Sequence, residues 1–92
     1  MTTLRFTGHA ADEMAHDGVS VAEVRAVVTT GVVLQQYQDD QPHPSRLMLG
    51  WCEGAPIHVV CANEAVDAIV VITVYRPDPR RWDETFTQRI KS

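Results

Sequence analysis

The run Ala68–Tyr75 (AIVVITVY) constrains the fold more than any other segment, because nearly all of its residues are apolar. Apolar side chains occupy both the odd and the even positions of the run, which is typical of a central strand covered on both faces. We expect helices to provide this cover. The chain has 92 residues, a length that fits one domain over residues 1–92 and leaves no room for a second.

Two short helices are predicted ahead of the main sheet. Thr7 can cap the first, which ends at Gly18. Ser20 begins the second, since Glu23 follows it by three residues in the capping-box pattern. The second helix runs to Gly31, and four valines recur along it at helical spacing: Val21, Val24, Val27 and Val28. Because valine is a mediocre helix former, this helix needs to bury its apolar stripe against a sheet.

Strands are predicted where alternating or continuous apolar runs are separated by turn residues. Glu53 and Gly54 form a turn between two such runs, which predicts a hairpin. The expected strands are a short first one at Thr2–Thr7, followed by Val32–Gln38, Arg46–Cys52, Pro56–Ala62 and Ala68–Tyr75.

The end of the chain carries the pattern of a helix. Asp78 is a candidate N-cap, with Pro79 at the first helical position. Trp82, Phe86 and Ile90 then recur every four residues. The predicted fold class is therefore α+β, with two N-terminal helices, a three- to four-stranded, mainly antiparallel sheet and a C-terminal helix.

The charge of the chain limits the partners that it can attract. Twelve acidic and eight basic residues give a net charge of −4, which disfavours a protein that coats nucleic acid through its overall field. The balance changes along the chain. Residues 1–75 hold three basic and nine acidic residues, whereas residues 76–92 hold five basic and three acidic ones. Any anion site should therefore use residues 76–92.

The common motifs for metals and nucleotides are missing from the sequence. Cys52 and Cys61 lie in apolar runs, and no Cys-x-x-Cys or His-x-x-x-His pair is present. There is also no glycine-rich phosphate loop and no Gly-x-Ser-x-Gly turn. We therefore expect no metal and no cofactor. Without an export signal or a long apolar run, a soluble cytoplasmic protein with no membrane partner is expected.

Several residues could carry chemistry, and each has a simpler structural interpretation. His58 lies within a strand, where a neutral histidine bonded to a backbone group is the simpler interpretation. His9 could merely orient the first helix. Tyr75 ends the buried strand, so its ring would join the core while its hydroxyl reaches an edge.

Arg80 and Arg81 fall in the first turn of the predicted C-terminal helix, where the helix dipole disfavours cations by roughly 0.3–1 kcal/mol. A carboxylate partner such as Asp83 or Asp39, or a bound anion, would compensate for this. Trp82 beside them adds a stacking surface of the kind that RNA-binding surfaces use.

Many of these residues belong to ordered motifs that span nearly the whole chain. The motifs are Thr7-x-His9-Ala10, Met14, Gly18-Val19-Ser20, Tyr37, Asp40-x-Pro42-x-Pro44-Ser45, Leu47-x-Leu49-Gly50, Ile57-His58-Val59-Val60 and Ile72-Thr73-Val74-Tyr75-x-Pro77-Asp78, with Trp82 and Arg89. In these motifs the sequence resembles the bacterial domain of unknown function 4258 family. That family is grouped with the RelE, ParE and BrnT-like toxins and is similar in size to the MqsR toxin.

The resemblance implies a RelE/BrnT-like fold, metal-free endoribonuclease activity and a cognate antitoxin protein as partner. Such cleavage needs a group that takes the proton of the ribose 2′-hydroxyl, a proton donor for the leaving oxygen and a cation near the phosphate. His58 and His9 are the expected acid and base, and Tyr75 is the expected orienting hydroxyl. The expected contacts to phosphate and RNA are Arg76, Arg46, Arg80 and Arg81.

Two other functions stay open. A catalytically silent toxin-like domain could use the same fold to bind a protein. The chain could also form a homodimer through a sheet edge, since Val32–Gln38 would lie at an edge and exposed edges invite partners.

Overall fold

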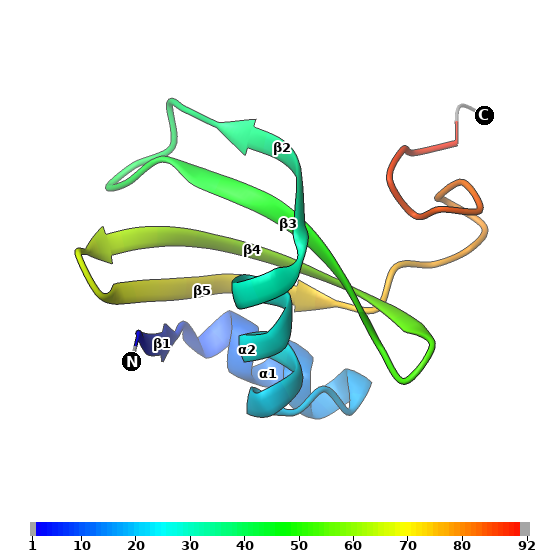
Figure 1. The fold of residues 1–92 in the computed structure, drawn as a ribbon, viewed down its shortest axis with the longest axis horizontal. Coiled ribbons are helices and arrows are strands. Elements are labelled where there is room, and N and C mark those ends of the chain that lie inside the picture. The colour runs from blue at the N-terminus through cyan, green and yellow to red at the C-terminus, as the bar shows by residue number, and fades with distance from the viewer. Residues whose placement is uncertain (1, 91–92) are drawn as a thin grey trace.

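The chain begins with a strand and two helices and continues with four strands. The elements are β1 (Thr3–Phe6), α1 (Gly8–Asp17), α2 (Val21–Thr30), β2 (Val32–Tyr37), β3 (Ser45–Cys52), β4 (Ala55–Ala65) and β5 (Ala68–Tyr75). All five strands form one sheet in the order β1-β5-β4-β3-β2 (Figure 1). This computed structural model describes residues 2–90. No helix within that range is both long enough and apolar enough to cross a membrane.

The two N-terminal helices are confirmed, and their first residues make the predicted capping hydrogen bonds. The hydroxyl oxygen of Thr7 accepts from the Ala10 N–H at 3.1 Å, and this hydroxyl also donates to the Ile72 carbonyl of β5. Ser20 and Glu23 form a reciprocal capping box, in which each backbone N–H donates to the other side chain. The caps therefore fix where both helices begin and attach α1 to the sheet.

Both helices pack on the same face of the sheet, and the core lies between them and the strands. Ile57, Val59 and Cys61 alternate along β4 and are completely buried. They form one cluster with residues of both helices, namely Ala10, Met14, Val24 and Val27. Because successive side chains of a strand point to opposite faces, His58 and Val60 face the other side of the sheet.

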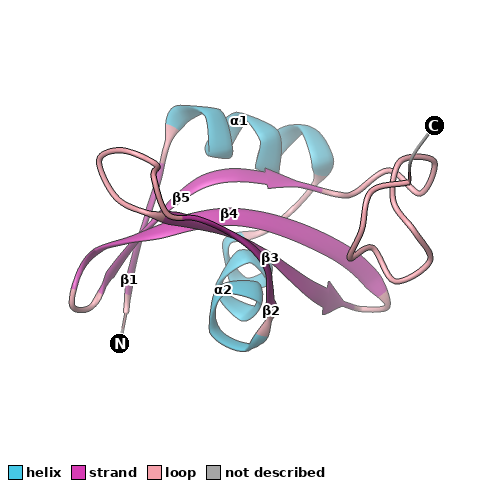
Figure 2. Ribbon diagram, turned by 90° about the horizontal axis from the view of Figure 1, so that it is seen from above, coloured by secondary structure: helices cyan, strands magenta, loops and turns pink. Residues whose placement is uncertain are grey.

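Irregular chain covers parts of this other face, so the expectation of helices on both faces of Ala68–Tyr75 is wrong. At one end, the loop between β2 and β3 borders a cavity of about 410 Å³ together with Val70 and Ile72. At the other end lie residues 77–90, which we call the C-terminal segment. Figure 2 shows this segment as a loop beyond the end of β5.

The sheet is also larger than the predicted three to four strands. The fifth strand is β1, which joins β5 as a parallel edge strand, with Thr3 opposite Ala68 and Phe6 opposite Val71. The other neighbouring strands are antiparallel. The apolar pattern locates a strand but does not report which distant strand it pairs with, and so the parallel pair was not predicted.

The predicted C-terminal helix does not form anywhere in the C-terminal segment. Asp83 gives a physical reason, because its Oδ1 atom accepts hydrogen bonds from the Thr85 N–H, the Thr85 hydroxyl and the Thr87 N–H. Such side-chain bonds compete with helical ones. Phe86 has a φ of 59°, in the left-handed region that an α-helix excludes. The RelE/BrnT-like prediction with a C-terminal helix is therefore corrected to a five-stranded mixed sheet with two helices.

Two of the three apolar residues of that pattern, Trp82 and Phe86, pack on the sheet without forming a helix, and Ile90 is exposed. Trp82 and Arg89 form an antiparallel bridge that closes the chain between them into a loop. The Trp82 ring meets the His58 ring edge-on, with 4.4 Å between ring centroids. Phe86 meets Trp51 of β3 in the same manner at 5.7 Å. These contacts hold the C-terminal segment against the face that the helices leave open.

Candidate functional site

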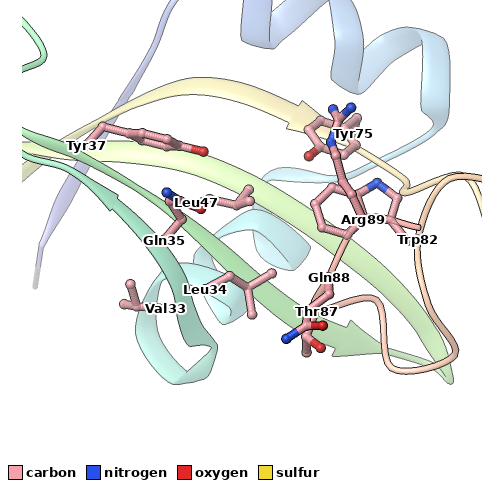
Figure 3. Close-up of a pocket in the computed structure, with 10 residues that line it drawn as sticks. All are labelled: Val33, Leu34, Gln35, Tyr37, Leu47, Tyr75, Trp82, Thr87, Gln88 and Arg89. Atoms are coloured by element: carbon pink, nitrogen blue, oxygen red, sulfur yellow. The ribbon is translucent and has the colours of Figure 1, made fainter. Parts of the chain in front are cut away.

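A cleft of about 620 Å³ lies on this open face, between β2 and the C-terminal segment (Figure 3). We call it the Tyr75 cleft, and its volume is within the range of small-ligand sites. Leu47 of β3 lies at its base. The lining residues that matter for its chemistry are Gln35, Tyr37, Tyr75, Trp82, Gln88 and Arg89.

Two tyrosine hydroxyls point into the cleft from opposite sides, one from Tyr37 and the other from Tyr75 (Figure 3). Burial raises the pKa of the Tyr75 phenol, and the nearby positive charge of Arg89 opposes that rise. Burial is the larger effect, so Tyr75 keeps its proton at neutral pH.

His58 lies directly behind Tyr75 and has no exposed surface. Its Nδ1 atom is 3.0 Å from the Tyr75 hydroxyl oxygen, and its Nε2 atom is 2.8 Å from the carbonyl oxygen of Phe86. Burial lowers the pKa of the imidazole, and the hydrogen bond to the Phe86 carbonyl partly offsets this. His58 is therefore a neutral side chain that lies behind the cleft, in contact with the Tyr75 hydroxyl and the Trp82 ring.

Arg89 supplies the positive charge of the cleft. Its guanidinium carbon lies 5.5 Å from the centre of the Trp82 ring, a distance at which a cation and an aromatic face attract each other. Within residues 2–90, Arg89 forms no salt bridge. Its planar donor group matches the geometry of a phosphate or a carboxylate.

The structure does not bring His9 near His58. His9 is exposed on α1, on the opposite side of the sheet, with its Nε2 atom 3.0 Å from Glu13 Oε1. The same carboxylate oxygen accepts a hydrogen bond from the Val74 N–H at 3.1 Å. The His9–Glu13 pair thus lies where α1 is attached to the end of β5, away from the Tyr75 cleft.

Arg76 follows Tyr75 in sequence but binds the end of α1. Its guanidinium donates to the carbonyl oxygens of Asp17 and Gly18, at 3.1 and 3.3 Å. Its backbone N–H donates to the Asp17 carboxylate at 3.2 Å. Carbonyls at the end of a helix lack helical partners and attract cations, so these contacts give Arg76 a structural role.

Arg46 also lies outside the Tyr75 cleft. Its guanidinium donates to the Asn63 side chain at 3.2 Å, and both residues border a different, smaller pocket. In the register of β3 and β4, Arg46 lies opposite Cys61, whose side chain faces the helices. The structure therefore does not place Arg46 and Arg76 together as a phosphate site.

Arg80 and Arg81 are exposed in the C-terminal segment. Arg80 has a carboxylate partner, which is Asp78 and neither Asp83 nor Asp39, through two hydrogen bonds of 3.2 and 3.0 Å. The Asp78 carboxylate raises the pKa of Arg80, and Arg80 in turn lowers the pKa of Asp78. Neither arginine lines the Tyr75 cleft.

Sequence reasoning missed Arg89, Gln35 and Gln88 as functional candidates. Two signals could have found Arg89, since it belongs to the motifs quoted above and lies in the basic end of the chain. Nothing in the sequence distinguishes Gln35 or Gln88 from other polar residues. Their position becomes visible only when β2 and the C-terminal segment face each other across the cleft.

The groups that this cleft offers are two phenolic hydroxyls, two side-chain amides and a guanidinium, with an imidazole behind the Tyr75 hydroxyl. Among residues 2–90, no three His, Cys, Asp or Glu side chains are close enough together to hold a metal ion. Cys61 is in the core on the other face, where burial raises the pKa of its thiol.

Together these features define a small domain in which a five-stranded mixed sheet carries two helices on one face and a polar cleft on the other. The family model described as Domain of unknown function (DUF4258) matches residues 6–76, and the chain belongs to this family. The predicted family is thus confirmed. No curated protein and no solved structure matches the chain. The matched region includes His58 and Tyr75 but ends before the segment that carries Arg89.

Proposed function

We propose that the protein is a metal-free endoribonuclease whose substrate binds in the Tyr75 cleft. The observation that carries the proposal is the presence of the Tyr75 hydroxyl and the Arg89 guanidinium in one polar cleft, with His58 buried behind the tyrosine. The grouping of the DUF4258 family with the RelE, ParE and BrnT-like toxins, which the motif resemblance implies, supports the same activity. The proposal includes a cytoplasmic location and a cognate antitoxin as the protein partner.

The proposed reaction is the attack of a ribose 2′-oxygen on the adjacent phosphorus, with cleavage of the bond from phosphorus to the 5′-oxygen. Solvent water takes the proton of the 2′-hydroxyl and gives a proton to the departing 5′-oxygen. Arg89 would neutralise the charge that develops on the phosphate oxygens. The Tyr75 hydroxyl would contact the ribose.

Other side chains of the cleft suit a nucleotide. The rings of Tyr37 and Trp82 offer surfaces on which a base can stack, and the amides of Gln35 and Gln88 can bond to a base or sugar. Arg80 and Arg81 would contact RNA beyond the cleft. His9, Arg46 and Arg76 have no role in this proposal because they lie outside the cleft.

The test is cleavage of single-stranded RNA by the purified protein in the presence of a metal chelator. We expect cleavage by the wild type, and a loss of about 100-fold or more for both Tyr75→Phe and Arg89→Gln. Arg5→Gln is the matched control, since Arg5 is an exposed arginine paired with Glu64 away from the cleft. Equal rates for the wild type and the two cleft variants would contradict the proposal.

The exposed edge of β2 favours a second candidate, a protein-binding module. Five of its six residues are exposed, and the exposed fractions of Val32 and Val33 are 56% and 44%. An uncharged edge strand can pair with a strand of another chain, such as an antitoxin or a second copy. A stable complex or dimer in light scattering, with no RNA cleavage, would favour this candidate.

A further inference from the structure

The Phe86 carbonyl determines which nitrogen of His58 carries hydrogen. A carbonyl oxygen can only accept, so the Nε2 atom at 2.8 Å must donate to it. The imidazole is neutral, and Nδ1 is therefore without hydrogen and must accept. Its partner is the Tyr75 hydroxyl, which consequently donates its single hydrogen to His58.

Because of these hydrogen bonds, the Tyr75 hydroxyl can act only as an acceptor toward a ligand in the cleft. With its hydrogen directed at His58, the hydroxyl oxygen offers only its remaining acceptor capacity to a ligand. The Arg89 guanidinium, in contrast, can only donate. The cleft thus combines a hydrogen-bond acceptor at Tyr75 with a cationic donor at Arg89. A ligand that matches both must carry a hydrogen-bond donor next to an anionic group.

We propose that the Tyr75 cleft selects ligands in which a hydroxyl donor adjoins an anionic group, as the 2′-hydroxyl adjoins the 3′-phosphate of a ribonucleotide. His58 is then a positioning residue, which acts on the ligand only by orienting the Tyr75 hydroxyl. This inference deepens the proposed function and rests on it for the choice of a nucleotide.

The C-terminal segment contributes to both halves of this arrangement. It carries Arg89, and the left-handed backbone at Phe86, with a φ of 59°, belongs to the turn that presents the Phe86 carbonyl to His58. The bridge between Trp82 and Arg89 closes that turn. A single folded loop therefore sets the polarity of Tyr75 and supplies the cation beside it.

The first test uses three nucleotides without a scissile bond: adenosine 3′-monophosphate and its 2′-deoxy and 2′-O-methyl analogues. NMR titration of the wild-type protein should give an affinity about 3- to 10-fold higher for the nucleotide with the free hydroxyl. The 2′-O-methyl analogue should bind as weakly as the 2′-deoxy one, because it can accept but not donate. In Tyr75→Phe the three affinities should become equal.

The second test reads the polarity without any ligand. The ¹⁵N chemical shifts of His58 in the wild type should show a hydrogen on Nε2 and none on Nδ1. If the His58→Leu variant folds, it should lose the preference for the free hydroxyl, because leucine cannot accept a hydrogen bond from Tyr75, while keeping the affinity for the 2′-deoxy nucleotide, which depends on Arg89. If this variant does not fold, the nucleotide titrations and the ¹⁵N shifts of the wild type test the inference.

Three results would overturn the inference: equal binding of the three nucleotides, binding of none, or a hydrogen on Nδ1. RNA cleavage combined with equal nucleotide binding would refute the selection mechanism and leave the proposed enzyme intact. Selective nucleotide binding without RNA cleavage would refute the enzyme and leave the ligand class intact. The two proposals can therefore fail separately.

Discussion

The burial of His58 links the stability of the protein to pH. Because its folded pKa is lowered, the unfolded chain binds more protons between the folded pKa and the unfolded value of about 6.5. Above about pH 6.5, the buried neutral His58 therefore makes its full contribution to the free energy of unfolding. This contribution decreases as the pH falls below that value. The groups that contact the imidazole are the Tyr75 hydroxyl, which stays neutral there, and the Phe86 carbonyl and the Trp82 ring, which do not titrate.

Urea unfolding at about pH 7.5 and about pH 5.5 measures this effect. The wild type should lose stability at the lower pH, and His58→Gln, which lacks the group, should lose less. An equal loss in both proteins would contradict the prediction. An NMR titration that places the folded pKa of His58 at or above about 6.5 would also contradict it.

At the level of single residues, the sequence singled out two residues of the candidate site, His58 and Tyr75. His58 and Tyr75 lie in regular strands next to each other, so alternation and the family motifs were enough to single them out. The partner proposed for His58 was His9, because sequence alone does not tell which face of the sheet a helix covers. Arg89 was not identified as a candidate because its position depends on an irregular loop, and such a loop produces no periodic pattern in the sequence.

The junction between α2 and β2 depends on a residue without a side chain. A Cβ atom on Gly31 would lie 2.5 Å from the Val27 carbonyl oxygen and 2.6 Å from that of Leu49. Both are backbone atoms, so the helix or the sheet would have to shift. We expect Gly31→Ala to lower the free energy of unfolding by roughly 2–3 kcal/mol in urea titration.

Gly8→Ala is the matched control for this substitution. A Cβ atom at Gly8 meets nothing within 4 Å, and its position at the start of α1 suits alanine. Its stability should stay within about 0.5 kcal/mol of the wild type. Similar stabilities for the two variants would show that the junction can relax around the added methyl group.

The turn in the C-terminal segment depends on the Asp83 carboxylate, which accepts three hydrogen bonds at a single oxygen. Removing it in Asp83→Ala should destabilise the segment by about 1 kcal/mol. Hydrogen exchange should report this as a faster rate at the Thr87 amide, which donates to that carboxylate.

Glu84→Ala provides the comparison for Asp83→Ala, since Glu84 is its exposed neighbour and another acidic residue of the loop. It should leave the Thr87 exchange rate unchanged. If both variants exchanged at the same rate, the carboxylate of Asp83 would not be what holds the turn.

Helices and strands that are marked by residues close together in the sequence could be predicted. Elements whose formation depends on competing side-chain hydrogen bonds, or on pairing with a distant strand, could not. Caps at Thr7 and Ser20 located both helices because a cap and its partner are three residues apart. The four-residue spacing of Trp82, Phe86 and Ile90 predicts a helix only if the backbone donors are available, and Asp83 takes two of them. The strand pairing of β1 has no local signal at all.

For the whole molecule, the net charge of −4 predicts that RNA binding depends weakly on salt. If Arg80, Arg81 and Arg89 each contact a phosphate, the logarithm of the affinity for single-stranded RNA should fall with the logarithm of salt with a slope of about −2.1. Arg89→Gln should bring the slope to about −1.4. Binding measured between roughly 50 and 200 mM salt tests this, and a much steeper slope would indicate a broader basic surface.

The parallel pairing of β1 with β5 has a consequence for the order in which the chain can assemble. Thr7, at the end of β1, bonds to Ile72, which is 65 positions later in the sequence. α1 also packs mainly on β5. During synthesis, β1 and α1 therefore have no place to dock until β5 has left the ribosome, and β1 is added to the sheet only after β5.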